Sequence, residues 1–183
     1  MPLVLSECVL PVRFNVAELL KSTAGVSEAH DVNEDIASID KDLDIVELLT
    51  GKVRLMRTST GILVTGHLCT KVRMPCRRCG VPVSVPVGLD LEEEFRPFVD
   101  IFTGAVIPVS DDEDEATRTD EHHVLDITEV VRQNLWLAMP MSPLCSPQCQ
   151  GLCPSCGANL NIGPSGCQHE DGDPRLAALR ELL

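Results

Sequence analysis

Eight cysteine and histidine side chains occur at spacings typical of metal ligands. The candidate ligands are Cys76, Cys79, Cys145, Cys149, Cys153, Cys156, Cys167 and His169. Two pairs form C-x-x-C-G motifs, whose tight turn lets two thiolates bind one tetrahedral ion. Because eight ligands divide evenly, the pattern predicts two closed, four-coordinate Zn²⁺ sites. A catalytic zinc site would keep a coordination position open, so these sites are expected to be structural.

Two ways of dividing the ligands are open. In the first, the four ligands from Cys153 onward close locally around one ion, while Cys145 and Cys149 complete a site with the first C-x-x-C motif. In the second, the two C-x-x-C motifs share one ion, as in a zinc ribbon. Local chelation costs less loop-closure entropy, which favours the first division. Cys8 and Cys69 have no partner in the sequence and are expected to be apolar fillers.

A thiol redox role is the alternative chemistry for these cysteines. In thioredoxin-like proteins the C-x-x-C motif opens a helix, whose dipole activates the thiol. Here Cys76 ends a predicted strand and another strand follows it, which disfavours that chemistry. The chain also has no Walker loop, dinucleotide fingerprint, G-x-S-x-G or H-E-x-x-H motif. No catalytic residue and no small-molecule substrate are therefore assigned, and the protein is expected not to be an enzyme.

Alternating hydrophobicity predicts the elements that position these ligands. Apolar and polar residues alternate from Ile62 to Met74 and again over 81–91, which indicates two strands. A shorter strand is expected over 52–57, and the acidic stretch 27–44 reads as a loop. An amphipathic helix is expected to begin at Asp126 and end before Pro140, and a short terminal helix to follow Asp173.

The predicted fold class is α+β. It comprises a small, mainly antiparallel sheet or partly closed barrel, one amphipathic helix, a zinc-stabilised C-terminal segment and a short terminal helix. Residues 1–140 are expected to form an α+β domain with an acidic loop over 110–121. Residues 141–183 are expected to be a cysteine-rich, zinc-binding segment packed on that domain as one structural unit.

Charge is segregated along the chain. The net charge is −13, yet residues 48–89 contain no acid and hold seven of the fifteen basic residues. One interpretation is a solvated strand face beside acidic loops. A solvated surface usually mixes both signs, however, so this segregation favours a partner-binding face. The basic residues proposed for that face are Lys52, Arg54, Lys71, Arg73, Arg77 and Arg78.

The expected location is the cytoplasm. The N-terminal residues show no basic region followed by an apolar stretch, and no apolar run approaches the roughly 18 residues needed to span a membrane. No membrane partner is expected. Reduced thiols suit a metal-binding role in that compartment.

Four segments together resemble the YceD family, also called domain of unknown function 177 or the large ribosomal RNA subunit accumulation protein family. They are M-P-C-R-R-C-G, L-D-I-T-E-V-V-R-Q-N-L, P-L-C-S-P-Q-C-Q-G-L-C-P-S-C-G-A-N-L-N and D-P-R-L-A-A-L. Within the third, the block G-L-C-P-S-C-G-A-N-L-N is specific to the cysteine-rich branch of that family. The tail departs from the family's usual C-x-C, since Cys167 is followed by Gln168 and His169. His169 is therefore the candidate replacement ligand.

The resemblance implies a non-enzymatic protein needed for accumulation or processing of 23S ribosomal RNA in large-subunit biogenesis. Its expected partner is ribosomal RNA or a pre-ribosomal particle. One alternative is a protein–protein adaptor that binds a ribosomal protein or a processing nuclease without touching RNA. The other is the thiol redox protein considered above.

Overall fold

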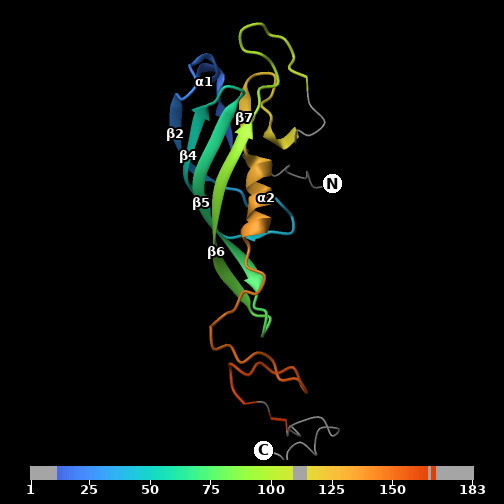
Figure 1. The fold of residues 1–183 in the computed structure, drawn as a ribbon. Coiled ribbons are helices and arrows are strands. Elements are labelled where there is room, and N and C mark those ends of the chain that lie inside the picture. The colour runs from blue at the N-terminus through green and yellow to red at the C-terminus, as the bar shows by residue number, and fades with distance from the viewer. Residues whose placement is uncertain (1–11, 109–114, 165, 168–183) are drawn as a thin grey trace, which may run out of the picture. The chain divides into compact units, whose positions relative to one another are not determined.

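The computed structural model describes residues 12–108, 115–164 and 166–167 of the chain. These residues form two compact units (Figure 1). The first unit contains the described residues of 1–74 and 84–141. The second contains Pro75–Val83 and the described residues from Ser142 onward. The expected division at residue 140, with one part packed on the other, stays a prediction.

A five-stranded sheet dominates the first unit. Its strands are β2 (Ser27–Glu34), β3 (Asp44–Ile45), β4 (Leu49–Arg57), β5 (Ile62–Pro75) and β6 (Pro82–Phe95). The order is β2-β4-β5-β3, and β6 also pairs with β5. The sheet is therefore open and does not close into a barrel. The α+β class and the antiparallel pairing expected from the alternating pattern are confirmed.

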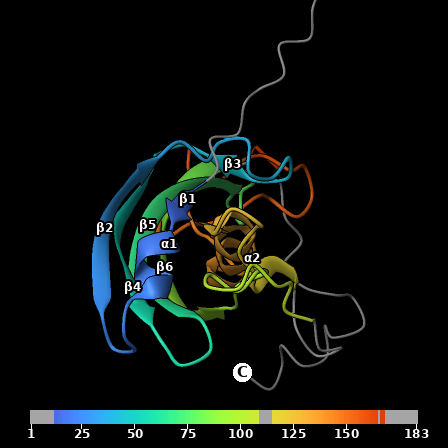
Figure 2. The ribbon, with the colours of Figure 1, turned by 90° about the horizontal axis from the view of Figure 1, so that it is seen from above.

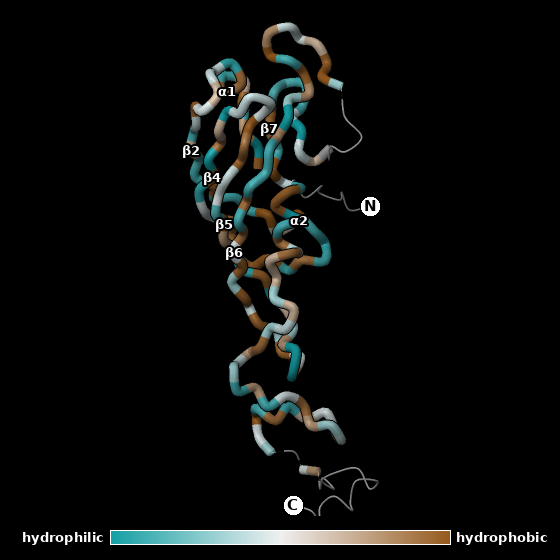
Figure 3. Tube along the Cα trace, viewed as in Figure 1, coloured by the Kyte–Doolittle hydropathy of each residue, from teal (hydrophilic) through white to brown (hydrophobic). Residues whose placement is uncertain are grey.

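Alternation along the strands gives this sheet one buried and one exposed face. Val53 and Leu55 of β4, and Val64, Leu68 and Val72 of β5, are each at most 1% exposed. Figure 3 shows hydrophobic and hydrophilic residues alternating along these strands. A one-residue shift in register would turn this apolar set to solvent, so the pattern fixes the pairing of β4 with β5.

Helix α2 (Thr128–Ala138) covers the buried face, and the sheet curves around it (Figure 2). Its inward stripe contains Val130, Val131 and Leu135. The helix begins two residues later than expected, because Asp126 is the last residue of a strand; the Asp126 side chain accepts the backbone N–H of Thr128 at 2.9 Å. A two-stranded sheet of β1 (Arg13–Asn15) and β7 (Val124–Asp126) and the short helix α1 (Ala17–Lys21) complete the unit.

One prediction about the N-terminal half is wrong. The stretch 27–44, interpreted as a loop, contains the eight-residue strand β2. Only Val32 of that strand is buried, because β2 lies at the sheet edge and carries polar residues on both faces. A strand of this kind lacks the alternation that reveals β5.

Two other expected elements fall wholly or partly outside the described residues. The helix expected after Asp173 lies outside them, as does most of the acidic loop 110–121. Glu115–Thr117 of that loop form a short 3-10 helix, η1. No helix within the described ranges is long and apolar enough to cross a membrane.

Candidate metal centre

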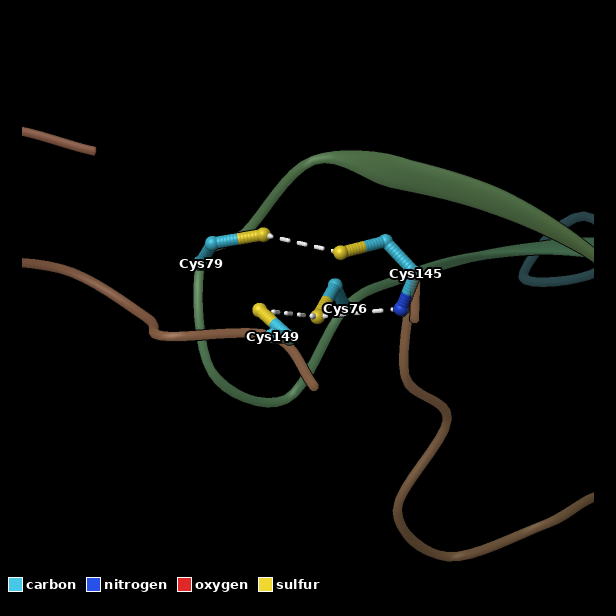
Figure 4. Close-up of side chains that lie close together, drawn as sticks. All are labelled: Cys76, Cys79, Cys145 and Cys149. Atoms are coloured by element: carbon cyan, nitrogen blue, oxygen red, sulfur yellow. Dashed lines mark hydrogen bonds between the residues drawn. The ribbon is translucent and has the colours of Figure 1, made fainter. Parts of the chain in front are cut away.

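Four cysteines of the second unit bring their sulfur atoms together (Figure 4). Cys76 and Cys79 lie in the turn between β5 and β6, and Cys145 and Cys149 lie in the segment after α2. The four Sγ atoms are all within 4.8 Å of one another. Three of the four residues are buried, and Val83 packs against them.

The sulfur–sulfur distances match those of thiolates around one tetrahedral ion. Cys76 Sγ lies 3.8 Å from Cys149 Sγ, and Cys79 Sγ lies 3.6 Å from Cys145 Sγ. A tetrahedral Zn²⁺ with Zn–S bonds of about 2.3 Å separates its sulfur ligands by about 3.8 Å. A disulfide would bring two sulfurs to about 2.05 Å, and these cysteines are free. The cluster therefore has the dimensions of a closed four-thiolate site.

Both C-x-x-C-G motifs adopt the same tight turn. The N–H of Gly80 donates to the Cys76 carbonyl, and the N–H of Gly157 donates to the Cys153 carbonyl, both at 2.9 Å. Both glycines have φ of 72°, in the left-handed region that side chains disfavour. Each motif thus presents its two sulfurs on one side of a turn that depends on its final glycine.

Hydrogen bonds favour negative charge on two sulfurs of the first cluster. The backbone N–H of Cys79 leads the effects that lower the pKa of Cys76 to about 6. Burial acts to raise the pKa of Cys149, but the Asn161 amide, 3.4 Å from its sulfur, and the Gly151 N–H outweigh burial and lower it. Anionic sulfur is the form that binds metal.

The other two thiols of this cluster are shifted in the opposite direction. Hydrogen bonding to Cys149 and Cys79 raises the pKa of Cys145 to about 12, because Cys145 then keeps its proton between two neighbouring sulfurs. The pKa of Cys79 is also raised, since burial and its contact with Cys76 outweigh the Val81 N–H. A bound cation would remove this competition by compensating all four sulfurs at once.

A second group contains Cys153, Cys156 and Cys167, whose sulfurs also lie within 4.8 Å of one another. The Cys156 N–H points at Cys153 Sγ, 3.4 Å away. A hydrogen bond that the Cys167 thiol donates to the Cys156 sulfur raises the pKa of Cys167 to about 11. The fourth predicted ligand, His169, lies outside the described residues. The two C-x-x-C motifs thus belong to different groups, and each of these groups could hold a metal ion.

The basic residues predicted for a binding face fall in both units. Lys52, Arg54, Lys71 and Arg73 lie at alternate positions on the exposed faces of β4 and β5, whereas Arg77 and Arg78 lie in the first cysteine turn of the second unit. Arg78 Nη1 donates to the Cys149 carbonyl at 2.7 Å, which connects this side chain to the first cysteine cluster.

Three of these basic side chains are balanced by acids from β2 and β3 and the residues beside them. Lys52 lies 3.5 Å from Asp31, Lys71 lies 2.6 Å from Glu47, and Arg73 lies 3.2 Å from Asp44. Within the described part of the chain, no ion pair involves Arg54 or Arg77. Residues 48–89 contain no acid, but in the folded chain acids from neighbouring residues lie beside their basic side chains.

Sequence reasoning missed two features. Asn161 donates to Cys149 Sγ, and only its place in the G-A-N-L-N block marked it. Cys69, expected as an apolar filler, is exposed on the outer face of the sheet and contacts His67. Its position two residues after His67 on one strand was a visible signal. Cys8 lies outside the described residues.

Comparison with known proteins identifies relatives along most of the chain. A family model described as Large ribosomal RNA subunit accumulation protein YceD matches residues 64–183. An uncharacterized protein of Mycobacterium tuberculosis (strain ATCC 25618 / H37Rv) is 32% identical over 94% of this chain and 82% of its own length. Uncharacterized protein YlbN of Bacillus subtilis (strain 168) is 25% identical over 93% of this chain and 94% of its own length.

A plant relative has a functional name. Large ribosomal RNA subunit accumulation protein YCED homolog 1, chloroplastic, of Arabidopsis thaliana is 26% identical over 71% of this chain and 47% of its own length. No solved structure matches the chain. The family match covers both cysteine groups, the strand β6 and β5 from its third residue onward.

Proposed function

The chain belongs to the YceD family of large ribosomal RNA subunit accumulation proteins, and from this we propose that it supports accumulation and processing of 23S ribosomal RNA during large-subunit biogenesis. The observation that carries the proposal is the family match over residues 64–183. The family is named for accumulation of an RNA, and we propose that this chain acts without catalysis. The proposed location is the cytoplasm, where reducing conditions keep thiols free.

The proposed cofactor is Zn²⁺, with two ions per chain. Cys76, Cys79, Cys145 and Cys149 would hold one ion, and the support is their mutual spacing and burial. Cys153, Cys156 and Cys167 would hold the other, with His169 as the proposed fourth ligand. Bound zinc would cross-link the turn that carries Cys76 and Cys79 to the segment that carries Cys145 and Cys149.

The proposed partner is ribosomal RNA within a pre-ribosomal particle, contacted through the basic residues. Binding to phosphate gains free energy when Lys and Arg release counterions, so a side chain already paired with a carboxylate contributes less. Lys52, Lys71 and Arg73 are paired in this way. We therefore propose that Arg77 and Arg54 contribute most, and that Arg78 mainly supports the turn through the Cys149 carbonyl.

Depleting the protein from its native cell tests the function directly. We expect a selective fall in the ratio of 23S to 16S ribosomal RNA, because the proposed role is restricted to the large subunit. The measurement is quantitative electrophoresis of total RNA, with re-expression of the intact chain as the control. An unchanged ratio would contradict the proposed role in large-subunit biogenesis, and the function of the protein would then have to be sought elsewhere.

The Arg77→Glu variant tests the proposed RNA contact. We expect co-sedimentation with pre-ribosomal particles to fall roughly tenfold, because charge reversal both removes a phosphate contact and adds repulsion. The zinc content should not change, because among the described residues Arg77 makes its hydrogen bond through its backbone N–H, to the Pro143 carbonyl, and not through its side chain. The matched control is Lys21→Glu on α1, which makes the same change in net charge.

The outcome also separates RNA binding from the adaptor alternative. The adaptor alternative is supported by two observations. Three of the six basic residues are ion-paired, and the chain carries a net charge of −13, which would attract a basic protein. If both variants sediment like the wild type, and particle association survives removal of RNA, the adaptor replaces the RNA-binding proposal. Binding that weakens steeply with salt and with Arg77→Glu supports direct RNA contact.

A further inference from the structure

Three side chains on the exposed face of the five-stranded sheet form a thiol–imidazole–carboxylate series. Cys69 Sγ lies 3.4 Å from His67 Nε2, and His67 Nδ1 lies 2.7 Å from Asp90 Oδ1. Cys69 and His67 are two residues apart on β5 and therefore point to the same face, while Asp90 comes from the neighbouring strand β6. None of the three belongs to the metal clusters.

This arrangement has the parts of an activated nucleophile. A reactive cysteine needs a base within hydrogen-bond reach and a third group that orients the base. His67 is in reach of the thiol, and a carboxylate on Nδ1 holds the imidazole with Nε2 directed at sulfur. We infer that Cys69 is a modification site whose thiol reacts with low-molecular-weight disulfides, with His67 as the base and Asp90 as the positioning residue.

The strand β6 leaves room for this geometry. A Cβ atom at Gly88 would lie 3.3 Å from His67 Cε1 and 3.6 Å from His67 Nε2. The missing side chain therefore allows the ring to lie over β6 and reach Asp90. Cys69 is itself exposed, so a small disulfide can reach the sulfur from solvent. An open sheet face of this kind suits modification by a small molecule.

The modification of Cys69 by a disulfide needs no metal and no cofactor. His67 Nε2 takes the proton of the Cys69 thiol, and the resulting thiolate sulfur attacks one sulfur of the disulfide. A bond from Cys69 Sγ to that sulfur forms as the reagent's S–S bond breaks. The departing thiolate takes the proton from the imidazolium. Cys69 is oxidised to a mixed disulfide, and one half of the reagent is reduced to a thiol.

The test is the rate at which oxidised glutathione modifies Cys69 in the full, zinc-loaded chain at pH 7. Trypsin releases residues 58–71 as one peptide, and Cys69 is its only cysteine, so mass spectrometry reads this site alone. The same sequence made as a free peptide has no strand β6 and serves as the reference. We expect Cys69 in the folded chain to react roughly tenfold faster than in the peptide, because the fold fixes a base beside the sulfur and orients it with Asp90.

Variants of His67 and Asp90 distinguish a thiol activated by a positioned base from a thiol that reacts only because it is exposed. His67→Gln is expected to slow the modification to the rate of the free peptide. Asp90→Asn should slow it partly, and Asp90→Glu should restore part of the loss by returning the carboxylate. His122→Gln, which removes an exposed histidine elsewhere, should leave the rate unchanged. Equal rates in the wild type, His67→Gln and the peptide would overturn the inference, because Cys69 would then react as an ordinary exposed thiol.

Discussion

A Cys149→Ser variant is expected to bind one Zn²⁺ ion per chain, whereas the wild type is expected to bind two. Cys149 is 1% exposed and supplies one of four sulfurs in the first cluster. A serine hydroxyl does not ionise near neutral pH, so the remaining three thiolates should bind zinc more weakly by roughly 100-fold or more. Metal binding and local folding are coupled in sites of this kind, so the Pro75–Val83 turn and the segment around Cys145 should also lose protection from proteolysis.

Elemental analysis after dialysis measures the zinc, and limited proteolysis followed by mass spectrometry measures the local structure. The matched control is Cys69→Ser, which removes an exposed thiol outside both clusters and should retain two ions. Two zinc ions in Cys149→Ser would contradict the assignment of this ligand. Absence of zinc from the wild type would contradict the proposed metal sites and would favour the alternative of a thiol redox protein.

The grouping of the cysteines shows where sequence reasoning was strong. The two C-x-x-C-G motifs are local, so their spacing alone indicated thiols that share a turn. The pairing of Cys76 with Cys149 joins residues 73 positions apart. Loop-closure entropy favoured this division over the zinc ribbon, because the ligands from Cys153 onward can close locally, but it could not decide between the two. The fold settles which sulfurs meet, while the identity of the ion and the role of His169 stay predictions.

The outer face of the sheet shows where sequence reasoning failed. Cys69 was expected to be an apolar filler, although it lies two residues after His67 on β5 and therefore on the same face. The contact of His67 with Asp90 depends on which strand lies beside β5. The same limit applies to the basic residues. Lys52 lies opposite Asp31 in the β2–β4 ladder, so charges that are segregated along the chain are interleaved in the sheet. Edge strand β2 was missed because its polar residues carry almost no alternation.

Leu135→Ala is expected to lower the free energy of unfolding of the first unit by about 3 kcal/mol, through lost burial and a residual cavity. Leu135 is 0% exposed and lies in the core between α2 and the sheet. Leu137, two residues later on the same helix, is 84% exposed, so Leu137→Ala should change stability by less than about 0.5 kcal/mol. Urea unfolding followed by circular dichroism measures both variants under the same zinc concentration. Because the two substitutions are chemically identical and have the same helix propensity, similar losses would show that α2 does not present Leu135 to the sheet.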